Sequence, residues 1–240
     1  MRLAILTGGS RGLGASLCNQ LSEMGWQVVE FSRTAPHPFS VAVDLASPES
    51  FRETVAATLA QFAPEGVEEL LAIHNAGTIQ PIGPTSSKDP QDVLANLNAN
   101  LVSGIVFLTE IVARFQGSRC RKTIVNISSG AAQKEYFGWS LYCAAKAGLE
   151  HFVRTLAVEQ GAQGHPFLAV NVDPGVMDTG MQALIRSSDI SDFPTVERFV
   201  QFHERGALAA PADVAAAVLR IAALPDLQSG QRHHVRDHAA

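Results

Sequence analysis

The sequence predicts a single α/β domain in which helices cover both faces of a doubly wound parallel sheet. Short apolar runs recur between longer segments of helical periodicity, and this alternation is typical of repeated βαβ units. Several of the runs are apolar throughout, as expected for parallel strands that are buried on both faces. The runs span residues 3–6, 28–31, 41–43, 70–73, 123–127 and 167–172.

Helices are expected between these runs. One follows the glycine-rich stretch after the first run, and a second begins near Pro48, with apolar residues every three or four positions from Phe51 to Phe62. Two long helical segments follow at 94–115 and 140–159. Each lies between two predicted strands, as the helix of a βαβ unit must.

The composition agrees with one folded domain spanning residues 1–240. Hydrophobic residues make up 46% of the chain and charged residues 17%, which excludes a disordered protein. No Gly/Ser linker, internal repeat or low-complexity segment marks a second domain. With 18 basic and 23 acidic residues the formal net charge is −5, so neither a nucleic acid nor an anionic membrane is expected as a partner.

The sequence also predicts a cytoplasmic protein. Its longest apolar runs are far shorter than the roughly 20 residues that span a bilayer, and no signal-peptide core follows Met1. The three cysteines, Cys18, Cys120 and Cys143, form no CxxC pair and have no metal-ligand spacing, which is typical of reduced thiols. No metal site is therefore expected.

One stretch interrupts the regular alternation. After a Pro174-Gly175 turn, residues 176–210 carry polar residues and scattered aromatics. The stretch follows a predicted strand directly, and in doubly wound sheets ligands bind beyond the carboxyl ends of the strands. We expect 176–210 to form a lid or substrate loop with short helices; the alternative is an ordinary surface insertion.

A glycine-rich turn follows the first predicted strand. Residues 7–14 read Thr-Gly-Gly-Ser-Arg-Gly-Leu-Gly and lead directly into a helical segment. Glycines allow a sharp turn and a close approach of the backbone to a phosphate, while the free N–H groups and the dipole of the helix attract negative charge. The turn is therefore expected to bind a pyrophosphate through Gly8, Ser10, Arg11, Gly12, Leu13 and Gly14.

The glycine spacing after Thr7 resembles that of the short-chain dehydrogenase/reductase superfamily. The resemblance implies a Rossmann-type fold and a nicotinamide dinucleotide cofactor. It also implies further cofactor contacts after the later strands, at Asp44, Leu45, Asn75, Ala76, Gly77, Pro174, Gly175, Val176 and Thr179.

The end of the second predicted strand distinguishes between the two nicotinamide dinucleotides. NAD enzymes place an acidic residue there for the ribose 2′-OH, whereas this chain has Ser32 and Arg33. A guanidinium can bind a 2′-phosphate with two parallel hydrogen bonds, and Arg11 could approach from the turn. The sequence therefore predicts NADP(H) as the cofactor.

Tyr142 and Lys146 lie four residues apart and share one face of a predicted helix. With Ser129 and Asn100 they match the catalytic residues of the resembled superfamily. The resemblance implies that Tyr142 protonates the carbonyl oxygen while Ser129 holds it. Lys146 would then bind the nicotinamide ribose, and Asn100 would support a water chain that resupplies the proton. A positive charge about 4 Å from a phenolate supplies about 4 kcal/mol, so Lys146 alone is expected to bring the pKa of Tyr142 close to physiological pH.

Three segments, 126–129, 138–147 and 174–182, look like sepiapterin reductase and the bacterial reductases of benzil and other vicinal diketones. This implies an NADPH-dependent reductase of a small-molecule 1,2-dicarbonyl, such as benzil or a pterin side-chain diketone. Trp139 would lie beside the substrate, and Asp237 would anchor a pterin. A homodimer or homotetramer through the helical segments 94–115 and 140–159 is also implied.

Two alternative functions are weighed. An NAD-linked alcohol dehydrogenase of the same superfamily would need an acidic residue at the ribose, where Ser32 and Arg33 stand instead. A dinucleotide-sensing protein without turnover usually lacks part of the catalytic set, which is complete in this chain.

Overall fold

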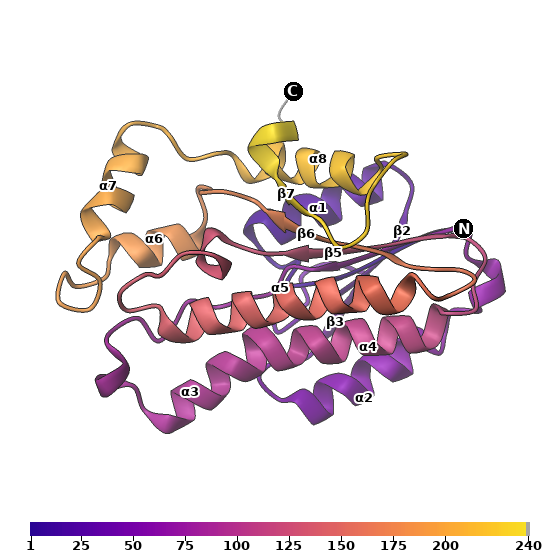
Figure 1. Ribbon diagram of the computed structural model, residues 1–240, viewed down its shortest axis with the longest axis horizontal. Helices are drawn as coiled ribbons and strands as arrows, with labels where there is room; N and C mark the ends of the chain where they lie inside the picture. Colours follow the sequence, from indigo (N-terminus) through magenta and orange to yellow (C-terminus); the bar gives the residue numbers. More distant parts are fainter. Residues whose placement is uncertain (239–240) are drawn as a thin grey trace.

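The computed structural model describes residues 1–238 and contains one sheet of seven parallel strands. The strand order β3-β2-β1-β4-β5-β6-β7 is that of a doubly wound sheet, so the predicted fold class is confirmed (Figure 1). The order reverses between β1 and β4, which opens a crevice at their carboxyl ends. The strands are β1 (Arg2–Thr7), β2 (Gln27–Ser32), β3 (Ser40–Ala42), β4 (Glu69–His74), β5 (Arg121–Ile127), β6 (Leu168–Asp173) and β7 (Arg232–His234).

Helices enclose the sheet on both faces (Figure 1). On one face α2 (Pro48–Leu59), α4 (Ser103–Phe115) and α5 (Ser140–Gln160) form a core with the strands. On the other face α1 (Gly12–Glu23) and α8 (Pro211–Ala222) form a second core. The remaining elements are α3 (Pro90–Leu97), α6 (Gly180–Arg186), α7 (Val196–Glu204), the 3-10 turns η1 (Pro64–Gly66), η2 (Thr85–Ser87), η4 (Gly130–Ala132) and η5 (Val235–His238), and the π-helical turn η3 (Asn98–Val102).

The apolar strands explain why both faces are covered. Successive residues of a strand point to opposite faces, so a run that is apolar throughout exposes apolar groups on both sides. In β1, Leu3 and Ile5 join the core beneath α2, α4 and α5, while Ala4 and Leu6 join the core beneath α1 and α8. Each face of the sheet is therefore stable only beneath its own layer of helices.

Two elements differ from the sequence-based expectation. The strand β7 has the polar sequence Arg-His-His and was not among the predicted runs; backbone pairing with β6 and an ion pair of Arg232 hold it in place. The predicted long helix at 94–115 begins earlier, at Pro90, and is continuous but contains one wider turn, η3, between α3 and α4. Neither a polar three-residue strand nor a single wider helical turn produces a hydrophobic periodicity that sequence analysis could detect.

Among the described residues, the continuous helical run Pro90–Phe115 is the one helix that is long and apolar enough to count as a candidate membrane span. Its residues Phe107, Leu108, Ile111 and Phe115 are completely buried in the core beneath the sheet. Core packing therefore accounts for the apolar residues on the buried face of this run.

Residues 176–210 contain α6 and α7 and extend past the carboxyl edge of the sheet, at the left of Figure 1. The two ends of this segment are joined by a parallel bridge between Met177 and Ala209. Asp178 N–H donates to the Ala209 carbonyl at 3.0 Å, and Ala209 N–H donates to the Val176 carbonyl at 3.1 Å. The segment contains short helices, as predicted.

Candidate active site

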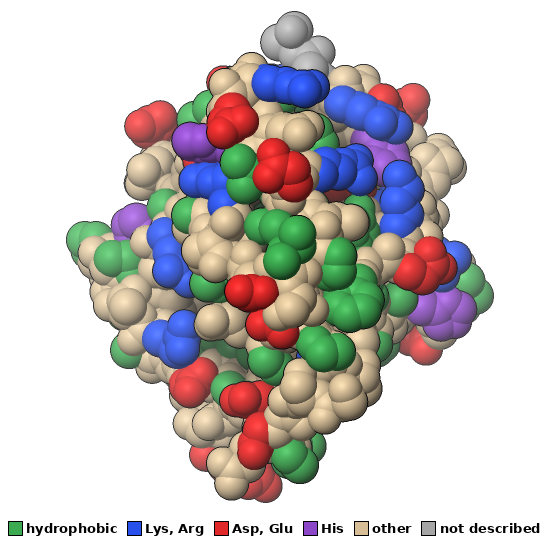
Figure 2. Space-filling model, turned by 90° about the vertical axis from the view of Figure 1, so that its left-hand side faces the viewer, with side chains coloured by type: hydrophobic (Ala, Val, Ile, Leu, Met, Phe, Trp, Pro, Cys, Tyr) green, Lys and Arg blue, Asp and Glu red, His purple; other side chains and the backbone are tan. Residues whose placement is uncertain are grey.

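A cavity of about 1140 Å³ lies at the carboxyl ends of the strands, between the sheet edge and the α6–α7 segment. Figure 2 faces this side of the molecule, where hydrophobic side chains gather near the centre and most Lys and Arg lie in the upper half. The cavity brings together most of the residues predicted from sequence. These are Gly8, Ser10, Arg11, Gly12, Leu13, Gly14, Ser32, Arg33, Asp44, Leu45, Asn75, Ala76, Gly77, Ser129, Trp139, Tyr142, Lys146, Pro174, Gly175, Val176 and Thr179.

The glycine-rich turn is packed too tightly for side chains at two positions. Gly8 has φ +74°, and a Cβ there would lie 2.7 Å from the Cα of Ala76. At Gly14 a Cβ would lie 2.0 Å from the Gly8 carbonyl oxygen. Asn75 fixes the turn from the neighbouring strand, because its Nδ2 donates to the same carbonyl at 2.9 Å.

The start of α1 suits an anionic group. The helix begins after Arg11, no side chain caps it, and its first turn has no acidic residue. Its free N–H groups and the positive end of its dipole are therefore available to an anion. The residues present fit the pyrophosphate of a dinucleotide.

Ser32 is the last residue of β2, Arg33 follows it, and both line the same cavity. The Ser32 hydroxyl is already engaged, since it donates to Glu30 Oε2 at 3.1 Å and accepts the Ala35 N–H at 3.2 Å. Within residues 1–238 no ion pair involves Arg33. Its guanidinium is thus available for a phosphate, while Ser32 shapes the loop.

Sequence analysis missed Glu30, which supports this end of the cavity. The carboxylate is completely buried and accepts the Gly9 N–H at 2.7 Å as well as the Ser32 and Ser40 hydroxyls. It therefore ties the glycine-rich turn to the Ser32–Arg33 loop. The available signal was one acidic residue inside the apolar run 28–31.

Tyr142 and Lys146 are both buried on α5 and line the cavity. The Lys146 Nζ lies 5.7 Å from the centre of the Tyr142 ring and donates to the Ile127 carbonyl at 2.8 Å. That bond orients the ammonium and leaves two of its three donors for other partners. The four-residue spacing therefore places the pair as the sequence predicts.

Burial controls the protonation of both groups. It raises the pKa of Tyr142 to about 12, although the Ser129 hydroxyl acts in the opposite direction. It also lowers the pKa of Lys146 to about 8. The expectation that Lys146 alone brings the Tyr142 pKa close to physiological pH is wrong, because it omitted the cost of removing the phenolate from water. Tyr142 is a protonated donor at neutral pH.

Ser129 follows β5 and lines the cavity. Its Oγ accepts the Ala131 N–H at 3.1 Å at the start of η4, so the hydroxyl hydrogen is left to donate to a substrate oxygen.

Asn100 lies behind the cavity surface rather than on it. It is completely buried in η3, accepts the Thr78 N–H and donates to the Thr78 carbonyl, both at 2.8 Å. A π-helical turn carries this residue, and such turns are frequent at functional sites. In the described structure Asn100 fixes the backbone at Gly77 and Thr78, and Thr78 lines the cavity.

One wall of the cavity is aromatic. Trp139 stacks on Phe193, with ring centres 4.7 Å apart, and packs against Phe199 at 5.5 Å. Both phenylalanines belong to the segment 176–210, and Trp139 precedes α5. Since Trp139, Phe199 and Phe202 line the cavity, the cluster joins the segment to the start of α5 and forms an apolar surface.

Asp237 is the predicted substrate residue that the structure does not bring to the cavity. It lies in η5, is exposed, and pairs with Arg236 at 3.5 Å. The chain turns back onto α8 after β7, which carries Asp237 away from the site. The expectation of a pterin anchor at this residue is corrected accordingly.

Comparison with known proteins agrees with this geometry. The sequence matches the family described as short chain dehydrogenase over residues 2–190. The chain belongs to the short-chain dehydrogenase/reductase family. It is therefore an oxidoreductase of a family that uses nicotinamide dinucleotides, and the resemblance seen in the sequence motifs is confirmed.

Several relatives in this family are similar over most of the chain. Benzil reductase ((S)-benzoin forming) of Bacillus subtilis is 35% identical over 226 residues, which cover 92% of this chain and 93% of the relative. Sepiapterin reductase of Meriones unguiculatus is 30% identical over 210 residues, covering 78% of this chain and 79% of the relative. The solved structure of the KRED1-Pglu enzyme is 27% identical, with a TM-score of 0.83 over 97% of this chain and all of that one.

Proposed function

We propose that the protein is an NADPH-dependent carbonyl reductase in which Tyr142 is the general acid. The observation that carries the proposal is the grouping of a protonated phenol, the Ser129 hydroxyl and the buried Lys146 ammonium in one cavity. Arg11 and Arg33 line the same cavity and supply the positive charge that a 2′-phosphate requires.

The chemistry follows from these side chains. When bound, the reduced nicotinamide supplies the hydride. Ser129 donates a hydrogen bond to the substrate carbonyl oxygen, and Tyr142 gives its proton to that oxygen as negative charge develops. The positive charge of Lys146 stabilises the phenolate that remains.

Tyr142 can donate a proton at neutral pH, since burial raises its pKa to about 12. The alternative of an NAD-linked alcohol dehydrogenase would need an acidic residue at the ribose, and Ser32 and Arg33 stand at that position instead.

The substrate class that we propose is a 1,2-dicarbonyl with an apolar body, such as benzil. Two observations support it: the 35% identity to a benzil reductase, and the apolar surface of Trp139, Phe199 and Phe202 beside the catalytic residues. An aromatic substrate can stack on such a surface.

The test is oxidation of NADPH and of NADH by the purified protein, with benzil, a second vicinal diketone and sepiapterin compared side by side. We expect turnover of benzil with NADPH. Tyr142→Phe should lower kcat about 100-fold or more while it retains cofactor binding. Preference for NADH would support the alcohol dehydrogenase, and cofactor binding with no turnover of any carbonyl would support a dinucleotide sensor.

A further inference from the structure

We propose that Arg232 is a positioning residue that fixes Ser129 and the Asp173–Gly175 turn from behind the active-site cavity. The inference rests on the proposed reductase function, because it assigns these two elements to substrate and cofactor. Arg232 lies in β7, the strand whose polar sequence no predicted run anticipated.

The guanidinium of Arg232 contacts both sides of the site. Its Nη2 donates to the Ser129 carbonyl oxygen at 3.1 Å and to Asp173 Oδ2 at 2.7 Å. Its Nη1 pairs with the Glu150 carboxylate and donates to Ser128 Oγ at 3.3 Å. The side chain is only 12% exposed, so these bonds are made largely out of water. A planar guanidinium presents five N–H donors in a rigid fork, whereas an ammonium presents three on a flexible stem.

The two carboxylates extend these contacts into the active site. Asp173 Oδ1 accepts the Gly175 N–H at 3.0 Å and thereby holds the turn that lines the cofactor cavity. Glu150 lies four residues after Lys146, on the buried face of α5 that also carries Tyr142. Its Oε2 accepts the Ser128 hydroxyl at 2.6 Å. One guanidinium thus joins Ser128–Ser129, the Asp173–Gly175 turn and α5, the helix that carries Tyr142 and Lys146.

Arg232 is also the cation that balances these two acids. The side chains of Glu150 and Asp173 are 6% and 11% exposed, and both pair with the same guanidinium. His234 Nδ1 is 3.4 Å from Asp173 Oδ2, but it shares only that one acid. Without Arg232, two buried carboxylates would lack their main partner, and the segments they hold would have to rearrange.

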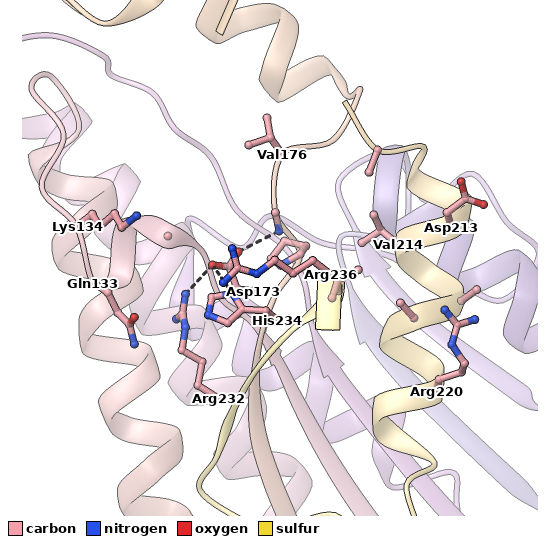
Figure 3. Close-up of a pocket in the computed structure, with 17 residues that line it drawn as sticks. Gln133, Lys134, Asp173, Val176, Asp213, Val214, Arg220, Arg232, His234 and Arg236 are labelled. Carbon is pink, nitrogen blue, oxygen red and sulfur yellow. Dashed lines mark hydrogen bonds and ion pairs between the residues drawn. The ribbon is translucent and has the colours of Figure 1, made fainter. Parts of the chain in front are cut away.

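A second cavity gives solvent access to this cluster. Figure 3 shows Arg232, Asp173 and His234 together among the residues that line it, with dashed lines for hydrogen bonds and ion pairs. Its volume is about 850 Å³, and Gly130 with residues 173–176 line both cavities and so lie between them. Asp173 and Arg232 line this second cavity, whereas Glu150 lies behind the guanidinium of Arg232. If Arg232 is shortened, a small guanidinium ion can therefore enter the space that its side chain leaves, and contact both acids, without passing through the active site.

The test is Arg232→Ala, assayed with benzil and NADPH in the presence and absence of low millimolar guanidinium. We expect kcat to fall about 100-fold, because misplacement of a reacting group by about 1 Å has that effect, while KM for benzil changes less than about threefold. Guanidinium should raise the kcat of Arg232→Ala at least about tenfold, and ammonium at equal ionic strength should not. The kcat of Arg232→Lys should lie between those of Arg232→Ala and the wild type. Arg220→Ala, in the wall of the same cavity, is the matched control and should match the wild type.

Two results would overturn the inference. One is Arg232→Ala with kcat within threefold of the wild type; the other is a folded, impaired variant that guanidinium leaves unchanged. If Arg232→Ala does not fold, Arg232→Lys carries the test, and its kcat must fall at least about fivefold with KM for benzil unchanged. A wild type that reduces no carbonyl would refute the proposed function instead. In that case the affinity for NADPH would test the role of Arg232, because the Asp173–Gly175 turn lines the cofactor cavity. The affinity is expected to fall in Arg232→Ala and to recover when guanidinium is added.

Discussion

Replacing Lys146 by methionine is expected to stabilise the fold while it removes activity. Burial lowers the pKa of Lys146 from 10.5 to about 8, a difference of about 2.5. At about 1.36 kcal/mol per pKa unit, keeping the ammonium charged at pH 7 costs the folded protein about 3 kcal/mol. Methionine loses the charge-assisted hydrogen bond to the Ile127 carbonyl, worth at least about 1.5 kcal/mol. The net gain of at most about 1.5 kcal/mol corresponds to a rise in Tm of at most roughly 3–6 °C at this chain length.

The pH dependence distinguishes this cause from better packing. The unfolded chain binds the lysine proton more tightly than the folded one, so wild-type stability rises between about pH 8 and 10.5. Urea unfolding of the wild type and Lys146→Met at pH 7 and pH 9.5 measures the effect. The advantage of the variant should nearly vanish at pH 9.5, and Lys134→Met, at an exposed lysine, should show none at either pH. A variant less stable than wild type at pH 7, or an advantage that does not depend on pH, would refute the reasoning.

Three further predictions concern the cofactor. Arg33→Ser should weaken NADPH binding about 10- to 100-fold and NADH binding less than twofold, because a charge-assisted bond is worth about 1.5–3 kcal/mol; equal losses in fluorescence titrations would contradict a 2′-phosphate site. Gly14→Ala should abolish NADPH binding in calorimetry, since the added carbon would lie 2.0 Å from a carbonyl oxygen, whereas Gly164→Ala, with nothing within 4 Å, should bind normally. The kcat/KM for NADPH should decline above about pH 8 as Lys146 loses its charge, and a profile flat to pH 10 would exclude that role.

Most of the sheet and the Tyr142–Lys146 pair were predictable because each depends on local sequence. The run 3–6 is apolar at every position, which identifies a strand covered on both faces, and it became the interior of β1. The turn after it packs so closely at Gly8 and Gly14 that a side chain would clash with the backbone, so only glycine fits there. Tyr142 and Lys146 meet because a helix places residues four apart on one face.

The remaining features depend on neighbours distant in sequence. Arg232 is a polar residue in a three-residue strand, and its position makes sense only once Glu150 and Asp173 lie beside it. The location of Asp237 depends on how the last turn packs against α8. The pKa of Tyr142 depends on its burial, which spacing along a helix does not reveal.

The bridge between Met177 and Ala209 has a consequence for how this protein can diverge from its relatives. A segment whose two ends are hydrogen-bonded to each other can change in length and sequence while the strands on either side keep their register, since little additional chain entropy is lost. Residues 176–210 can in this sense vary between their tied ends, and such variation alters the cavity wall that Phe199 and Phe202 form while the strands on either side stay in place. The variation is restricted where the segment touches the rest of the site, at Phe193 and Phe199 against Trp139 and at Thr179 beside Gly12.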